Sequence, residues 1–167
     1  MTEQAEQAAA QAIRDSRGGM YLTFALGEEE YGLEILKVRE IIGMMNVTAV
    51  PRTPDFIRGV INLRGRVIPV MDLRLKFGME QVEETEETCI IVVTLGELDM
   101  GIVVDKVREV LDIAADDIED SPEFGEDVST DYILGMGKSE DRVTILLDIS
   151  KVLSGDEIAA LEETANK

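Results

Sequence analysis

Few segments of this sequence carry side chains at a spacing that could perform chemistry. The fragment Gly137-Lys138-Ser139 matches the end of a phosphate-binding loop. That loop needs a glycine five positions before Gly137, where this chain has Tyr132, and it must open a helix whose free N–H groups hold the phosphate. The internal repeat described below instead predicts a strand end and a turn here. A small nucleotide-dependent enzyme is therefore the less favoured functional class.

Other catalytic and metal-binding patterns are missing. The sequence has no histidine, which removes the imidazole base, the Ser-His-Asp triad and histidine metal ligands. Its single cysteine, Cys89, lies in an apolar run and is predicted to be a buried, inert thiol. A calcium loop starting at Asp120 fails because Pro122 and Phe124 stand where oxygen ligands belong. We expect a non-enzyme without metal or cofactor.

The candidate residues must be positioned mostly by short strands. Apolar residues alternate from Met20 to Leu26 and again from 31 to 35, across a turn-like run at 27–30, which predicts a β-hairpin. Further strands are predicted at 47–50, 56–63, 66–71, 88–95, 100–105, 132–136 and 142–149. Many short strands with tight turns indicate a mainly β fold, either barrels or a sandwich. At 167 residues and 45% apolar, the chain suits one compact domain or a closely packed pair.

An internal repeat divides the chain into two related units. At an offset of 69, residues 27–42 and 96–111 share seven of 16 positions, including Lys-Val-Arg-Glu at 37–40 and 106–109. At an offset of 76, residues 56–59 and 66–72 match 132–135 and 142–148. Each unit is too small to be very stable alone, so the two are expected to pack together. Asp72 and Asp148 are equivalent, which favours a structural role such as a helix cap.

Two residues that differ between the copies are candidate contact residues. Arg64 is predicted at the tip of a hairpin with Gly65, where the second copy has Glu140-Asp141. Its guanidinium suits bidentate pairing with a carboxylate, either a partner's or that of Glu40 in the same chain. Phe124 lies in an acidic loop, where it is either a lid over the core or an exposed contact residue.

Charge is distributed unevenly. The chain has 16 basic and 35 acidic side chains, a net charge of −19, which argues against binding to nucleic acid or to anionic membrane surfaces. Residues 31–78 nevertheless carry a local charge of +4, whereas residues 79–131 carry −16. Opposite-signed regions can orient charged protein partners. No apolar run approaches the length of a membrane span, so a cytoplasmic location is expected.

Four segments resemble the CheW family of chemotaxis coupling proteins. They are residues 32–41, 53–65, 68–74 and 101–105, and within the second the string 56–65 (Phe-Ile-Arg-Gly-Val-Ile-Asn-Leu-Arg-Gly) is highly specific. The resemblance covers about residues 18–155. It implies two intertwined, five-stranded SH3-like β-barrels of about 20–87 and 88–153 with strand exchange, within a domain of 19–155. A flexible arm (1–18) and a C-terminal helix or tail (155–167) would flank this domain.

The resemblance also implies a function. Such a protein is a non-catalytic adaptor that couples chemoreceptor tips to the regulatory domain of the histidine kinase CheA, as a monomer that joins rings within membrane-associated receptor clusters. The matching positions implicated in this coupling are Val38, Glu40, Gly59, Arg64, Val107 and Val110, with Phe124 at the ring contact with CheA. A paralogue that serves a non-flagellar chemosensory array is the alternative within the family.

Overall fold

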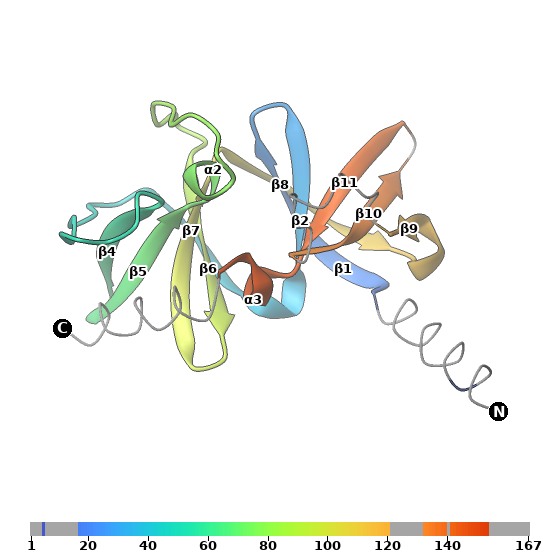
Figure 1. Cartoon of the computed structure of the whole chain (residues 1–167), viewed down its shortest axis with the longest axis horizontal. Coiled ribbons are helices and arrows are strands. Elements are labelled where there is room, and N and C mark those ends of the chain that lie inside the picture. Colours follow the sequence, from blue (N-terminus) through green and yellow to red (C-terminus); the bar gives the residue numbers. More distant parts are fainter. Residues whose placement is uncertain (1–4, 6–16, 121–131, 140, 154–167) are drawn as a thin grey trace.

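The computed structural model describes residues 5, 17–120, 132–139 and 141–153, which form two β-sheets (Figure 1). The first sheet has the strand order β8-β1-β2-β11-β10-β9 and the second has the order β3-β6-β7-β5-β4. The strands of the first sheet are β8 (Lys106–Ile113), β1 (Gly19–Leu26), β2 (Glu29–Glu34), β11 (Arg142–Leu147), β10 (Ile133–Ser139) and β9 (Ile118–Glu119). Those of the second are β3 (Val38–Gly43), β6 (Cys89–Leu95), β7 (Leu98–Val104), β5 (Arg66–Asp72) and β4 (Ile57–Leu63).

Each sheet combines strands from the two halves of the sequence. The N-terminal hairpin β1-β2 joins the C-terminal strands through a parallel pairing of β2 with β11. The hairpin β6-β7, its equivalent in the repeat, joins the N-terminal strands through a parallel pairing of β7 with β5. All other strand pairs are antiparallel. Neither sheet can therefore be completed by one continuous half of the chain.

A glycine in each parallel pairing leaves room for a neighbouring side chain. Gly32 of β2 lies opposite Leu146, and a Cβ atom at Gly32 would lie 2.9 Å from the Cδ2 atom of Leu146. Gly101 of β7 lies opposite Val70 of β5, and a Cβ atom there would lie 3.4 Å from Cγ2 of Val70 and 2.7 Å from Cγ2 of Ile90 on the antiparallel neighbour β6. The offset of 69 aligns these two glycines, so the repeat preserves the close approach in both sheets.

A shared hydrophobic core connects the two sheets. Its buried side chains come from β1 and β2 of the first sheet, including Phe24 and Leu33, and from β6 and β7 of the second, including Ile91 and Met100. Two smaller clusters lie apart from it, one around Val70 in the second sheet and one in the first sheet that consists of Tyr21, Ile113, Ile118 and Leu146. Because the largest cluster belongs to both sheets, separating them would expose its apolar surface to water.

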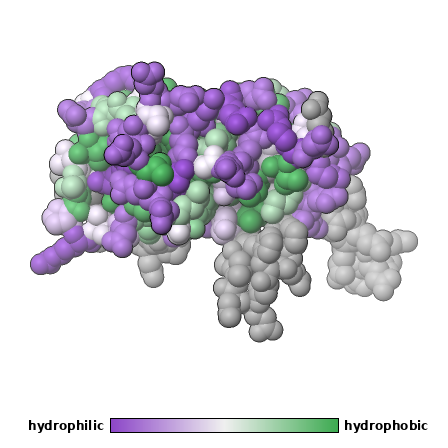
Figure 2. All heavy atoms as spheres, turned by 90° about the horizontal axis from the view of Figure 1, so that it is seen from above, coloured by the Kyte–Doolittle hydropathy of each residue, from purple (hydrophilic) through white to green (hydrophobic). Residues whose placement is uncertain are grey.

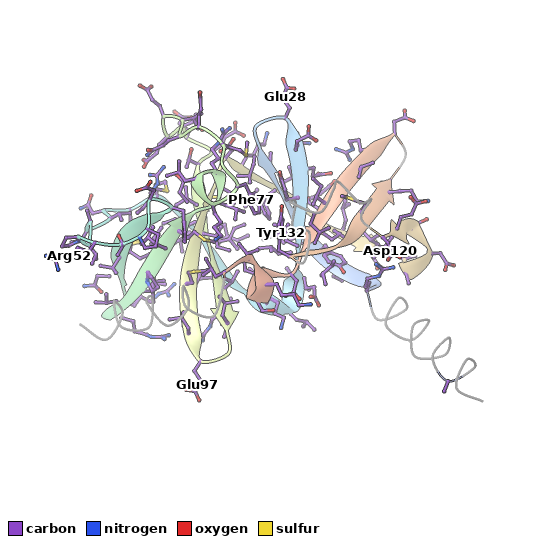
Figure 3. All side chains as sticks on the ribbon, in the orientation of Figure 1. Glu28, Arg52, Phe77, Glu97, Asp120 and Tyr132 are labelled. Carbon is purple, nitrogen blue, oxygen red and sulfur yellow. The ribbon has the colours of Figure 1, made fainter. Side chains whose placement is uncertain are left out.

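Four aromatic rings form a stacked row within this shared core. Phe24 of β1 stacks on Tyr31 of β2 with ring centroids 5.9 Å apart, Tyr31 stacks on Phe77 at 5.7 Å, and Phe77 stacks on Tyr132 at 5.3 Å. Figure 3 places Phe77 and Tyr132 close together where the two sheets meet. Burial raises the pKa of Tyr31 above its ordinary value. The stacked rings therefore connect β1 and β2 with Phe77, which follows α2, and with Tyr132, which precedes β10.

Local sequence rules predicted several elements correctly. The hairpin over β1 and β2 is confirmed, as is the β4-β5 hairpin, whose turn residues Arg64 and Gly65 both have positive φ, 52° and 87°. The capping role of the equivalent aspartates is also confirmed. Asp72 accepts a hydrogen bond from the N–H of Arg74 at the start of α2 (Leu73–Lys76), and Asp148 accepts one from the N–H of Ser150 in α3 (Ile149–Val152).

Other predictions of secondary structure were wrong. Residues 47–50 form no strand, and only Thr48 makes an isolated bridge, to Val60. The strand predictions omitted the two-residue β9 and also β3 and β8, each of which is one of the two edge strands of its sheet. In β3 and β8, a β-bulge falls within the repeated Lys-Val-Arg-Glu segment and interrupts the alternation of apolar and polar residues. The helix predicted over 155–167 lies outside the described residues.

A partly buried ion pair at the second sheet also contacts the β1-β2 turn of the first sheet. Arg74 in α2 donates two hydrogen bonds to Asp105, which follows β7, and Asp105 also accepts one from the N–H of Gly27 in the β1-β2 turn at 2.8 Å. The hydrogen bonds from Arg74 lower the pKa of Asp105 below its ordinary value, against the opposing effect of burial. The carboxylate therefore stabilises the fold in its charged form.

We predict that Asp105→Asn makes the protein less sensitive to acid. Because the pKa of Asp105 is lower in the folded than in the unfolded chain, its stabilising effect is present above the unfolded value of about 3.9 and is lost as the pH falls through the folded value. Urea denaturation should show a free-energy gap between wild type and variant at pH 7 that shrinks below about pH 4. A gap that stays constant with pH, or one equal to that of Asp112→Asn on the exposed face of β8, would contradict this role.

Candidate functional site

The structure brings two of the predicted site residues into direct contact. Arg64, in the β4-β5 turn, donates two hydrogen bonds to Glu40 on β3, from Nη1 to Oε1 and from Nη2 to Oε2, each 2.7 Å long. The sequence left open whether Arg64 pairs with a partner or with Glu40, and in the structure it pairs with Glu40. These hydrogen bonds lower the pKa of Glu40, more than partial desolvation raises it, and the charges of Arg64 and Arg39 act in the same direction.

The Glu40–Arg64 pair is exposed. The side chain of Arg64 is 69% exposed and that of Glu40 is 30% exposed. Solvent and salt screen such a pair, so it adds little to the stability of the fold. It does hold the guanidinium in a defined position on a tight turn, with its remaining N–H groups available to another molecule.

A charged pocket of about 260 Å³ lies beside this pair. Within it, the buried carboxylate of Asp99 binds Arg39 at 2.7 Å and Arg66 at 2.8 Å and accepts a hydrogen bond from the hydroxyl of Thr94. Burial raises the pKa of Asp99, but these hydrogen bonds and the two arginine charges outweigh it and leave the pKa below its ordinary value. The pocket is lined by Arg39, Glu40, Leu63, Arg64, Arg66, Ile68, Val92 and Asp99.

Sequence reasoning missed the Asp99 network. Arg39 stands in the repeated Lys-Val-Arg-Glu segment, which was a visible signal, but its partner Asp99 is 60 residues away in the sequence. Only the pairing of β6 with β3 and with β7 brings these residues together.

The position of Gly59 gives this residue a structural role in β4. It is buried in β4 with a φ of 141°, and a Cβ atom there would lie 2.0 Å from the backbone oxygen of Thr48. Thr48 and Val60 exchange two backbone hydrogen bonds at this point, of 2.8 and 2.9 Å. The equivalent Gly135 approaches Glu119 in the same way, at 2.9 Å from its backbone oxygen. The same requirement in both copies is a sign of a structural role.

The valines among the predicted site residues lie on the two outer strands. Val38 on β3 and the equivalent Val107 on β8 are half-buried and pack against the shared core. Val110 lies further along β8 and is 43% exposed. Val107 and Val110 are thus on the first sheet, whereas Glu40 and Arg64 are on or beside the second. Phe124 lies outside the described residues.

The alternative of a nucleotide-dependent enzyme that uses Gly137-Lys138-Ser139 gains no support from the structure. Gly137, Lys138 and Ser139 lie in the strand β10, and Lys138 binds Glu119 at 2.8 Å. Within the described residues, no group of His, Cys, Asp or Glu side chains is arranged to hold a metal ion. Burial raises the pKa of the half-buried thiol of Cys89, which keeps it in its less nucleophilic form. No described helix is long and apolar enough to cross a membrane.

The two β-sheets exchange strands between the repeats, and an ordered charged pair joins β3 to the β4-β5 turn at the surface. A family model for the CheW-like domain matches residues 20–157. The chain is 47% identical over 148 residues to the chemotaxis protein CheW of Klebsiella aerogenes, covering 89% of each chain. It is 34% identical over 139 residues to CheW of Bacillus subtilis, covering 81% of this chain and 87% of that one.

A solved structure agrees with these sequence matches. The scaffolding protein TtCheW from Thermoanaerobacter tengcongensis superposes with a TM-score of 0.76 at 34% identity, covering 84% of this chain and 95% of that one. The chain belongs to the CheW-like family, whose members are coupling scaffolds of chemotaxis signalling. The predicted fold of two SH3-like β domains is confirmed, with the two-residue β9 as an additional strand of the first sheet.

We predict that Gly59→Ala destabilises the protein by more than about 2 kcal/mol, because the added methyl group meets backbone atoms and the left-handed φ disfavours alanine. Urea denaturation measures this loss of unfolding free energy. Gly43→Ala is the matched control, since a Cβ atom there has no neighbour within 4 Å, and it should change stability by no more than about 0.5 kcal/mol. A stable Gly59→Ala protein that has lost partner binding would make Gly59 a contact residue instead.

Proposed function

We propose that this protein is a non-catalytic adaptor that couples chemoreceptor tips to the regulatory domain of the histidine kinase CheA. The observation that carries the proposal is the exposed, bidentate Glu40–Arg64 pair, held on a tight turn beside a charged pocket. A rigid guanidinium with free donors is suited to binding a carboxylate or backbone carbonyl of a partner. Membership of the CheW-like family supports the same conclusion.

Apolar side chains on the outer strands would supply the second part of the interface. Val38 and Val107 border the shared core, and Val110 is exposed on β8. Leu36, in the short turn before β3, is 93% exposed and adds an apolar side chain next to Val38. We infer that these residues contact a helical segment of the receptor, because the apolar face of an amphipathic helix docks against such side chains.

The charge distribution would orient the two partners. The segment that contains β3, β4 and β5 is basic, whereas the segment from residue 79 to 131 is strongly acidic. Figure 2 shows one broad face that is mostly hydrophilic, with smaller apolar areas between the charged side chains. Complementary charge increases the rate of association and selects the orientation of a partner more than it raises affinity. The adaptor would act in the cytoplasm as a monomer that joins rings at receptor clusters, with Phe124 at the ring contact.

The proposal is tested by reconstitution with CheA and receptor-bearing membranes. We expect this protein to co-sediment with both and to raise receptor-dependent autophosphorylation of CheA. Loss of both effects in otherwise active membranes would refute the proposal. A chemoreceptor set from a non-flagellar pathway, used in parallel, distinguishes a paralogue of that pathway by its preferred receptor.

We predict that Arg64→Glu weakens co-sedimentation and kinase activation at least about tenfold, since one or two charge-assisted hydrogen bonds to the partner are lost. The melting temperature should change little because the side chain is exposed.

Arg52→Glu is the matched control for this substitution. Arg52 is another exposed arginine with a left-handed φ, of 64°, so the variant has the same change of charge and the same backbone conformation (Figure 3). It should couple like the wild type. Equal loss in the two variants would assign the effect to net charge, and no loss in Arg64→Glu would remove Arg64 from the interface.

A further inference from the structure

The internal repeat places a second charged pocket on the first sheet, equivalent to the one beside Arg64. It has a volume of about 240 Å³ and lies between β2, β8 and β11. The offset of 69 aligns Glu30 in this pocket with Asp99 in the other. The pocket is lined by Glu28, Glu29, Glu30, Arg108, Arg142 and Val143. The hairpin tips beside the two pockets, at Glu28 and Glu97, point in opposite directions (Figure 3).

The two pockets differ in how their buried carboxylate is paired. Asp99 binds two arginines, Arg39 and Arg66, and both of its oxygens have a partner. The repeat aligns those arginines with Arg108 and Arg142. In the described part of the chain, neither Arg108 nor Arg142 forms an ion pair with Glu30 or with another carboxylate, although both line its pocket.

Glu30 is therefore left with an unpaired oxygen. The residue is only 9% exposed, and its Oε2 accepts a hydrogen bond of 2.8 Å from the hydroxyl of the buried Thr144. Its Oε1 is buried and has no hydrogen-bond partner. A buried carboxylate oxygen without a donor is unfavourable, and a ligand that supplies the donor gains the energy of a charge-assisted hydrogen bond.

The charges around Glu30 select a cation. Three carboxylates and two guanidinium groups line the pocket, whereas the pocket beside Arg64 has two carboxylates and three guanidinium groups. The two equivalent pockets therefore have opposite net charge. A metal ion is disfavoured, because no group of carboxylates among the described residues is arranged to hold one. Among cationic ligands, the pocket is therefore best suited to an organic cation with N–H donors.

We propose that the Glu30 pocket binds an arginine side chain presented by a segment of a partner protein. The N–H donors of a guanidinium can supply the hydrogen bond that Oε1 of Glu30 lacks, and Glu28 and Glu29, which also line the pocket, add to its negative charge. Val143, which is 52% exposed at the edge of the pocket, offers an apolar contact for the aliphatic part of the side chain. This site is separate from the Glu40–Arg64 pair and does not depend on its role.

The experiment is an NMR titration of the full-length protein with the capped tripeptide Ac-Gly-Arg-Gly-NH2. We expect saturable shifts of the Glu30, Val143 and Thr144 resonances. The same peptide with citrulline, which is neutral and similar in shape, should produce none. Glu30→Gln should weaken binding about tenfold, whereas Glu97→Gln, which removes the same charge from the equivalent tip of the other sheet, should leave it unchanged.

A second variant keeps the test decisive if Glu30→Gln fails to fold. Val143→Lys changes an exposed side chain and places an ammonium group of the same chain beside Glu30, so it should compete with the peptide and weaken its binding. The proposal is overturned if the arginine and citrulline peptides behave alike, if no shift saturates, or if binding is unchanged in these variants. It is also overturned if acetate or phosphate shifts the same resonances, since the pocket would then bind anions through Arg108 and Arg142.

Discussion

Two parallel strand pairings, β2 with β11 and β5 with β7, determine the architecture of this protein. The pairing of β2 with β11 joins an early strand to a late one, whereas β5 and β7 both lie in the continuous segment 38–104 that forms the second sheet, so the first sheet needs both ends of the described chain. Gly32 and Gly101 leave room for neighbouring side chains in these pairings, and the shared core with its four stacked rings lies between the sheets. Long-range pairing of this kind is entropically unfavourable to form, and it unites the two sheets in one cooperative unit.

A single cooperative unit suits a coupling scaffold. An adaptor transmits a change from one partner to another only if its own surfaces keep their relative positions. Here the Arg74–Asp105 pair reaches the Gly27 turn across the sheets, and the two charged pockets lie at equivalent positions whose hairpin tips point in opposite directions. The two copies of one β unit have thus diverged at their exposed charges while their capping aspartates remain equivalent.

The sequence correctly predicted the local elements that depend on residues close together in the chain. The β1-β2 hairpin, the Arg64-Gly65 turn and the capping aspartates depend on residues a few positions apart, and all three are confirmed. Strands β3 and β8 escaped prediction because a bulge interrupts their alternation. The pairing of Asp99 and the unpaired oxygen of Glu30 depend on contacts between distant segments, for which a single sequence gives only the indirect signal of its repeat. Gly59 stays a predicted site residue, and the nearby backbone of Thr48, which leaves no room for a Cβ atom, gives it a structural reason as well.

Native-state hydrogen exchange measured against denaturant concentration tests most directly whether the intertwined sheets form one rigid scaffold. The slowest amides of β2 and β11 in the first sheet and of β5 and β7 in the second should exchange with the same free energy and the same denaturant dependence, equal to those of global unfolding. If the amides of one sheet exchange through an opening of lower free energy and smaller denaturant dependence while the other sheet stays protected, the sheets unfold independently and the central claim is wrong.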